Sequence, residues 1–187
     1  KGHTSKVDCV ECSPNGEEIA SCDGQDLRIW HSHTGKALLL PIPVKARSLG
    51  WTSNGQQLIA GCDNGYIKFF DPSTGSQLAQ WKGHNGIVHS ISISSNGKFF
   101  ASGSQDKTVR LWDTTTRQQI SPPLQHDGYV YSVATSRDGR HLASGGEDKN
   151  ARIWSLIGVL PQCLLEDAPT STPICNAVRV YLSTKLC

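Results

Sequence analysis

The sequence predicts an all-β fold built from repeated antiparallel meanders, and three observations support this prediction. Short stretches with one apolar face recur between turn signals, as at residues 87–94, 99–103 and 109–112. The pairs that separate them, such as Asn96-Gly97, tolerate the positive φ of a tight turn, and this region carries no helix signal. The pattern then repeats along the chain. One such unit cannot bury its own faces, so it must stack on the next.

The residues that repeat are Gly83-His84, Ser102, Asp106 and Leu111-Trp112-Asp113 in one unit, and His126, Ser144, Asp148 and Ile153-Trp154 in the next. With these residues at these spacings the chain resembles the WD-repeat family, over about residues 1–157. The resemblance implies a β-propeller with four antiparallel four-stranded blades. Members of that family usually close a ring with more blades than four. The resemblance therefore implies an incomplete or partly open propeller, a fragment of a longer array.

The repeats are expected at about residues 2–40, 41–82, 83–124 and 125–157, followed by a non-repeat tail at 158–187. The tail has three prolines among its first sixteen residues and no turn aspartate in register, so we expect it to be unrelated to the blades and poorly ordered. A candidate strand lies at 178–182. The absence of methionine indicates that the sequence is a piece of a longer chain.

Two repeats depart from the pattern. Repeat two has no histidine in register, and Gly61 and Phe70 replace its serine and tryptophan. We therefore expect this blade to be held by packing alone, with Asp63 lacking a histidine partner. Repeat one has a shortened second turn, in which either Asp23 or Asp26 takes the place of the turn aspartate.

The His126, Ser144 and Asp148 set allows two interpretations, a catalytic triad or a buried structural network. The same set recurs as His84, Ser102 and Asp106, whereas an active site needs to occur only once. No G-x-S-x-G elbow is present. The resemblance implies hydrogen bonds between aspartate and histidine, between histidine and the serine hydroxyl, and between serine and the ring N–H of Trp112 or Trp154. We predict a structural network and no catalytic residue.

The resemblance also implies a partner-binding rim, one and three residues after the histidine and just before the turn aspartate. These positions are Thr4, Lys6, Asn85, Ile87, Gln105, Asp127, Tyr129 and Glu147, with Pro43 and Lys45 by register in repeat two. Ile87 and Tyr129 suit interface anchors, and Lys6 and Lys45 add positive charge. This favours a protein or peptide ligand with apolar and acidic groups. Alternatively, Ile87 packs against its blade and Tyr129 covers a strand edge.

Composition argues against several other classes of partner. The net charge is +2 and no apolar run approaches the length of a membrane span, so neither nucleic acid nor membrane is expected. Cys9 and Cys12 with His31 and His33 suggest zinc, but an offset of three places two strand residues on opposite faces. We predict no metal and no cofactor. Seven cysteines without framework spacing favour a reducing intracellular compartment, the cytoplasm.

The sequence thus predicts a non-enzymatic protein–protein interaction scaffold that presents a rigid propeller rim. The alternative is a ligand-sensing or regulatory segment of a larger NTPase or signalling enzyme whose catalytic part is absent here. The 42-residue spacing of His84 and His126 is similar to that of WD arrays in fungal NACHT-type signalling proteins. A hydrolase would need an exposed Ser144. Further partners expected are more repeats of the same chain, or a second copy bound through open blade edges.

Overall fold

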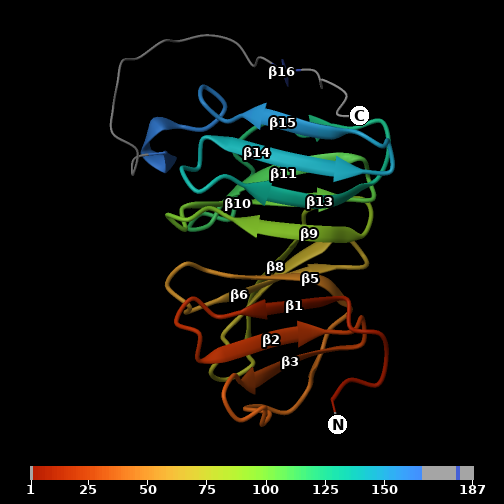
Figure 1. Ribbon diagram of the computed structural model, residues 1–187, viewed down its shortest axis with the longest axis vertical. Helices are drawn as coiled ribbons and strands as arrows, with labels where there is room; N and C mark the ends of the chain where they lie inside the picture. Colours follow the sequence, from red (N-terminus) through yellow and green to blue (C-terminus); the bar gives the residue numbers. More distant parts are fainter. Residues whose placement is uncertain (1, 166–179, 182–187) are drawn as a thin grey trace.

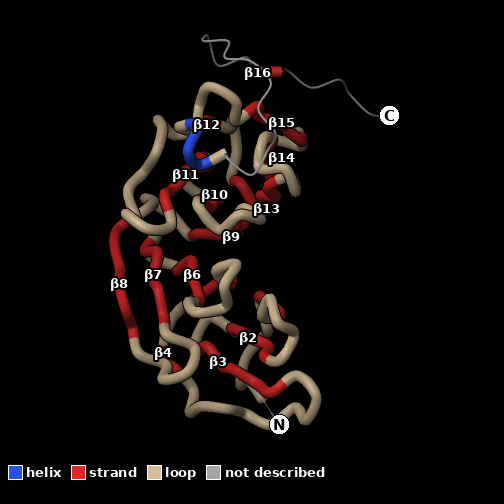
Figure 2. The backbone as a smooth tube through the Cα atoms, turned by 90° about the vertical axis from the view of Figure 1, so that its left-hand side faces the viewer, coloured by secondary structure: helices blue, strands red, loops and turns tan. Residues whose placement is uncertain are grey.

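The computed structural model describes residues 2–165 and 180–181. Four antiparallel sheets, here called blades 1 to 4, stack one after another along the molecule (Figure 1). Blade 1 contains β1 (Cys9–Cys12), β2 (Glu18–Cys22), β3 (Asp26–His31) and β4 (Ile42–Pro43). Blade 2 contains β5 (Ala46–Trp51), β6 (Leu58–Cys62), β7 (Tyr66–Phe70) and β8 (Gln77–Lys82). The stack is curved, with blades 1 and 4 at its two ends (Figure 2).

Blades 3 and 4 have the same arrangement. Blade 3 contains β9 (Val88–Ile93), β10 (Phe99–Ser104), β11 (Thr108–Asp113) and β12 (Leu124–Gln125). Blade 4 contains β13 (Val130–Thr135), β14 (His141–Gly146), β15 (Ala151–Ser155) and β16 (Val180–Tyr181). The first strands of neighbouring blades lie side by side, and the Val133 N–H donates to Ser90 Oγ across 3.1 Å. The sheets do not close into a ring, as the sequence led us to expect.

The first turn of every blade has the same local chemistry. In blade 3 the Ser94 hydroxyl donates to Asn96 Oδ1 at 2.8 Å, and Gly97 follows with a φ of 69°. Equivalent side-chain pairs are Ser13 with Asn15, Thr52 with Asn54, and Ser136 with Asp138. In a hairpin turn, a short polar side chain can accept backbone N–H groups, and glycine adopts the positive φ that the turn needs. These hairpins can therefore form from local sequence.

Burial along the strands shows where the blades are stacked. All six residues of β10 are buried, because Phe99 packs against blade 4 and Phe100 packs against blade 2. Successive side chains of a strand point to opposite faces, so a strand covered on both faces is buried along its whole length. In the end blade the pattern alternates: His141 is exposed and Leu142 is buried. Only one face of blade 4 is covered by the described residues.

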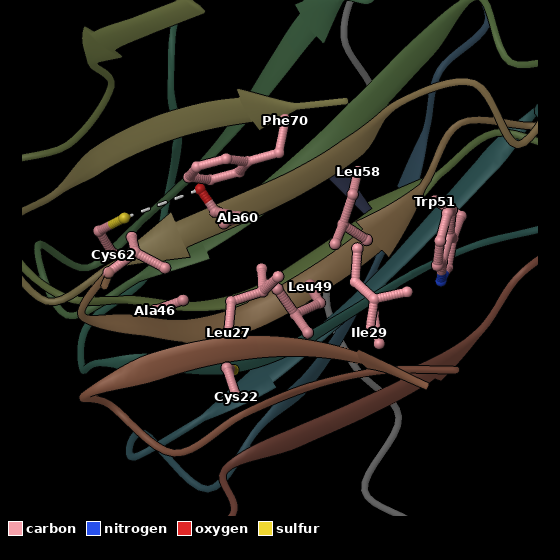
Figure 3. Close-up of a cluster of buried hydrophobic side chains, with 12 residues drawn as sticks. Cys22, Leu27, Ile29, Ala46, Leu49, Trp51, Leu58, Ala60, Cys62 and Phe70 are labelled. Carbon is pink, nitrogen blue, oxygen red and sulfur yellow. Dashed lines mark hydrogen bonds between the residues drawn. The ribbon is translucent and has the colours of Figure 1, made fainter. Parts of the chain in front are cut away.

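Each pair of neighbouring blades shares one apolar core. Between blades 1 and 2, Leu27 and Ile29 meet Leu49, Leu58 and Trp51 (Figure 3). Leu27, Ile29 and Leu58 are completely buried, and burial of such a side chain contributes roughly 1.5–3 kcal/mol. Trp51 is 6% exposed and belongs to this core. These cores, and not the individual sheets, give the blades their stability.

The two outer faces of the stack expose apolar residues. Val10 on blade 1 is 57% exposed, whereas Ile91 at the equivalent place in blade 3 is 8% exposed because blade 2 covers it. Ile153 on blade 4 is 57% exposed, whereas its blade 3 counterpart Leu111 is fully buried. The described residues therefore leave one blade face open at each end.

The prediction of a tail unrelated to the blades is wrong for residues 158–165. Leu160 and Leu164 join the core between blades 3 and 4, and a 3-10 turn spans Gln162–Leu164. Asn96 Nδ2 donates to the Leu164 carbonyl at 2.8 Å and fixes the segment to the first turn of blade 3. Leu160 and Leu164 pack here because their side chains are apolar, although the prolines had indicated a poorly ordered tail.

The candidate strand at 178–182 corresponds to β16, which pairs antiparallel with β15. The chain after residue 155 thus returns to supply the fourth strand of blade 4. The rest of the predicted tail, residues 166–179 and 182–187, lies outside the described residues.

Candidate functional site: buried networks and a loop rim

Blade 3 holds a buried chain of hydrogen bonds below its loops. The His84 Nδ1–H donates to Asp106 at 2.9 Å, and Ser102 Oγ lies 2.7 Å from His84 Nε2. The Trp112 ring N–H donates to the same serine oxygen at 2.8 Å. His84 and Ser102 are almost completely buried. The chain ties three elements together: the loop before β9, strand β10 and the end of strand β11.

Blade 4 repeats this arrangement. His126 Nδ1 lies 3.1 Å from Asp148, and its Nε2 lies 2.7 Å from Ser144 Oγ. The Trp154 ring N–H donates to Ser144 at 2.7 Å. Ser144 is 4% exposed and already engaged by both neighbours. A hydroxyl in this state has no open face for a substrate, so the geometry favours architecture over catalysis.

Burial sets the protonation states of both networks. Burial lowers the pKa of His84, although Asp106 opposes the shift, and burial likewise lowers the pKa of His126. Burial opposes charge on Asp106, but hydrogen bonds from His84 and Thr108 outweigh it and lower its pKa. Each network therefore pairs a neutral imidazole with a carboxylate at neutral pH.

Blade 1 contains a related but looser set. His3 Nε2 lies 2.6 Å from Ser21 Oγ, and the Trp30 ring N–H donates to that serine at 2.8 Å. Asp23 accepts backbone N–H groups on both sides of its turn, including that of Thr4, as Asp106 accepts from the residue after His84. Asp23 is therefore the turn aspartate that the sequence left open, and these bonds hold its pKa at about 2 despite burial.

His3, Asp23 and Asp26 converge closely enough to be considered as metal ligands. The residues do not fit that role. Both oxygens of Asp23 accept backbone N–H groups, and both oxygens of Asp26 accept the Arg28 guanidinium at 2.9 and 3.0 Å. A cation would have to compete with these donors for the carboxylate oxygens.

The expectation that blade 2 is held by packing alone is wrong. Arg47 Nε donates to Asp63 at 2.6 Å, and Arg47 Nη1 donates to Asp8 of blade 1 at the same distance. Asp63 thus has an arginine partner in place of a histidine. The sequence assignment of Gly61 to the serine position is wrong, because Ala60 pairs with Leu49 and Lys68 as Ser102 pairs with Ile91 and Arg110. At the neighbouring Gly61, a Cβ would lie 2.5 Å from both Ser48 Oγ and Val88 Cγ1. Ala60 has no hydroxyl, and the ion pair of Arg47 with Asp63 stands where the other blades have a network.

The predicted rim residues lie together at one end of the blades, on the loops before the first strands and the turns before the third. The exposed members are Thr4, Lys6, Lys45, Asn85, Asp127 and Glu147, and the half-buried ones are Ile87, Gln105 and Tyr129. The Gln105 N–H donates to the Ile87 carbonyl at 2.9 Å, and the Glu147 N–H donates to the Tyr129 carbonyl at 2.8 Å. These backbone bonds join each loop to its neighbouring turn.

Sequence reasoning missed a further position on this rim, five residues after the histidine position. It is occupied by Asp8, Arg47, His89 and Tyr131. In blades 2, 3 and 4 it coincides with a register shift at the start of the first strand. Such bulges turn a side chain out of the regular alternation. Tyr131 is 50% exposed and meets the His89 ring edge-on at 5.2 Å. The spacing was visible in the sequence, but the bulge was not.

Ion pairs alter the charge expected of the rim. Lys6 lies 3.1 Å from Asp8, and Arg47 is held between Asp8 and Asp63. Lys45 makes no ion pair with the residues that the structure describes. Asp127 is paired with Arg152. The positive charge that the sequence suggested for this rim is therefore largely neutralised, with Lys45 as the exception.

Among the described residues, no helix has the length and apolar character needed to cross a membrane. Cys9, Cys12, Cys22, Cys62 and Cys163 are free thiols.

The chain is similar to parts of longer WD-repeat proteins. It is 29% identical over 97 residues to the WD repeat-containing protein 91 homolog of Dictyostelium discoideum, covering 48% of this chain and 13% of that protein. It is 34% identical over 65 residues to the intraflagellar transport protein 122 homolog of Danio rerio, covering 35% of this chain and 6% of that protein. The chain thus matches only a small part of these relatives.

A solved structure described as the crystal structure of RRP9 WD40 repeats has the same fold. The TM-score is 0.76 at 20% identity, and the match covers 82% of this chain and 49% of that chain. The family model described as "WD domain, G-beta repeat" matches residues 1–31, 43–71, 75–113 and 118–155, well over half of the chain. The third match combines β8 of blade 2 with β9 to β11 of blade 3, so this sequence repeat spans two blades. The chain belongs to the WD40 repeat family.

Proposed function

We propose that this chain is a non-enzymatic scaffold that presents its loop rim to protein or peptide partners. WD-repeat proteins generally act in this way, and the two intact networks support the loops from below. Ser102 and Ser144 are buried within those networks, which favours a structural role for the only repeated serine, histidine and aspartate set. Rigid loops on a β-scaffold lose little entropy when a partner binds.

The observation that carries the proposal is an apolar and aromatic group on the rim of blades 3 and 4. Ile87 and Tyr129 are half-buried, and Tyr131 stands half-exposed with His89 against its ring. Aromatic side chains held by neighbours combine large contact area with little remaining freedom, as binding hot spots require. The backbone bonds at Ile87 and Tyr129 fix the loops that carry them.

The ligand chemistry follows from this group. We propose a peptide segment that places apolar side chains over Ile87 and Tyr129 and an acidic group toward Lys45. Lys45 supports the acidic preference, whereas the ion pairs of Lys6 and Arg47 reduce it. The remaining positions, Thr4, Asn85, Gln105, Asp127 and Glu147, supply polar contacts around the centre.

The test begins with peptides selected for binding to the chain from a random display library. Their affinities are then measured for the wild type, for the double variant Ile87→Ala/Tyr129→Ala, and for Leu78→Ala. Leu78 is 45% exposed on the outer strand of blade 2 and serves as the matched control. We expect affinity to fall at least about tenfold for the double variant only, a loss typical of hot-spot residues. Unchanged affinity for the double variant would sink the proposal.

The open blade faces support a proposal about assembly. Further repeats of a longer chain, or a second copy, would cover Val10 at one end and Ile153 at the other. In sedimentation experiments, a concentration-dependent dimer that Ile153→Glu abolishes supports the second copy. A monomer at all concentrations favours further repeats.

These relatives do not support the alternative of a regulatory segment in an NTPase or signalling enzyme. They also do not support the likeness to fungal NACHT-type arrays. An intracellular site of action is our proposal, which a relative named for intraflagellar transport supports.

A further inference from the structure

The turn after β11 contains an arginine in a backbone conformation that suits glycine. Arg117 has a φ of 62°, and the equivalent residues of blades 1 and 2 are Gly35 and Gly75, with φ of 66° and 74°. All three donate their N–H to the carbonyl four residues earlier, at 2.8–2.9 Å. The turn is therefore the same, but only blade 3 among these carries a side chain at this position. Strained residues of this kind occur preferentially at functional sites.

The charge of Arg117 has no partner among the residues that the structure describes. Its guanidinium carbon lies 5.4 Å from the ring centre of Phe69 in blade 2, and its Nε is buried without a hydrogen bond. By contrast, Arg28 is paired with Asp26, and Arg152 with Asp127. The aromatic ring holds the guanidinium in place while leaving its donors free for another group.

Arg117 lines a shallow cavity of about 290 Å³ between blades 2 and 3, at the end opposite the rim. Its other polar lining residues are Thr52, Ser53, Asn54, Gln57, Thr114 and Thr115. No carboxylate lines it. Thr114 Oγ1 is buried without a hydrogen bond, and within the described range the hydroxyls of Ser53 and Thr115 also make none. One fixed positive charge is thus surrounded by neutral hydroxyl and amide donors.

We propose that this cavity binds the carboxylate of an acidic peptide, with Arg117 as its cationic donor. A guanidinium matches a carboxylate in charge and in planar geometry, and the surrounding hydroxyls can donate to its remaining lone pairs. A phosphate dianion would leave one negative charge unmatched by this single arginine. The proposal rests on the proposed scaffold function only in taking the carboxylate from a peptide, and it uses none of the rim residues.

The test follows the Arg117 Nε–Hε resonance by NMR in the labelled full chain. The probes are the blocked peptide acetyl-Gly-Glu-Glu-Gly-amide, its glutamine counterpart, and inorganic phosphate. We expect a saturable shift of this resonance with the glutamate peptide and none with the glutamine peptide. The Arg28 Nε–Hε group already donates to Asp26 and should stay unshifted. No response to the glutamate peptide, or a stronger response to phosphate, would overturn the carboxylate assignment.

Two variants locate the response. Arg117→Gly places in blade 3 the residue that blades 1 and 2 already have, so the turn should be kept while the backbone amides of Thr114 and Thr115 lose their response to the peptide. The rim variant Ile87→Ala/Tyr129→Ala should respond like the wild type. A response that survives in Arg117→Gly, or that disappears in the rim variant, would place the peptide elsewhere. The two variants therefore distinguish failure of the proposed carboxylate site from failure of the proposed binding rim.

Discussion

The Ser144 hydroxyl shows how a single atom organises a blade. It meets His126 Nε2 at 2.7 Å and accepts the Trp154 ring N–H at 2.7 Å, in a place that water does not reach. Removing it leaves two buried polar groups without a partner. The cost of such orphaned groups is larger than the net gain from forming the bond, because they remain desolvated.

Ser144→Ala should therefore lower the free energy of unfolding by about 1–3 kcal/mol. Ser132→Ala, on the exposed part of strand β13, should change it by less than about 0.5 kcal/mol. Urea unfolding followed by tryptophan fluorescence measures both. Equal stability of the two variants would mean that the network is not structural.

The networks also make stability depend on pH. Because burial lowers the pKa of His84 and His126, the unfolded chain binds protons below about pH 6.5 that the folded chain does not. Asp106 and Asp148 have lowered pKa values, so their contribution is present above about pH 3.9 and is lost on further acidification. Arg110 faces Asp106 in blade 3, and Arg152 faces Asp148 in blade 4.

We expect the free energy of unfolding to fall from pH 7 to pH 5 and to fall again below pH 4. His126→Gln should flatten the first part of this dependence. Unfolding titrations at each pH provide the measurement. A flat profile between pH 7 and pH 5 in the wild type would contradict the buried, neutral histidines.

At the scale of elements, blade 2 shows that a degraded repeat is not a weak one. Ala60 stands in the place of the missing serine, and a side chain at the neighbouring Gly61 would run into Val88 of blade 3. Its missing histidine is replaced by Arg47, which links Asp63 to Asp8 of the preceding blade. A larger residue at Gly61 should therefore destabilise this blade.

Gly61→Ser should destabilise the chain by about 1–3 kcal/mol through overpacking. Combining it with Val88→Ala, which removes the nearest methyl groups, should cost less than the sum of the two single changes. Chemical denaturation of the four proteins completes the double-mutant cycle. A stabilising effect of Gly61→Ser alone would show that blade 3 does not pack closely against this position.

How far the sequence predicts this molecule depends on the range of the interaction. The hairpins and the intact networks follow from spacing, because Asn96-Gly97 and the 42-residue interval from His84 to His126 specify local geometry. The ion pairs of Arg47 could not be predicted from the sequence, because its partners Asp8 and Asp63 lie in two different blades. The bulge at Tyr131 and the packing of Leu160 and Leu164 also depend on neighbours that no local pattern indicates.

At the scale of the whole molecule, the stacking of the blades buries residues between neighbours and leaves the outer faces of blades 1 and 4 exposed. Gly103 and Gly145 occupy equivalent places in blades 3 and 4. A Cβ on Gly103 would lie 2.8 Å from Val130 and 2.9 Å from Val133, whereas a Cβ on Gly145 would approach only the Asn150 carbonyl, at 3.8 Å. The difference exists because the next blade covers one glycine and nothing described covers the other.

Gly103→Ala should thus destabilise the chain by about 1–3 kcal/mol, while Gly145→Ala should be neutral within about 0.5 kcal/mol at low protein concentration. Thermal unfolding of the two variants side by side tests this. An equal loss in both would show that the outer face of blade 4 is packed against another surface.

The central claim is that this fold holds a rim for binding a peptide or protein. The most direct measurement is hydrogen–deuterium exchange of the wild-type chain, with and without each library-selected peptide. The account predicts new protection confined to the loops at residues 85–89 and 127–131 on the rim. Protection instead on the outer faces of blades 1 and 4, with the rim loops unchanged, would contradict it.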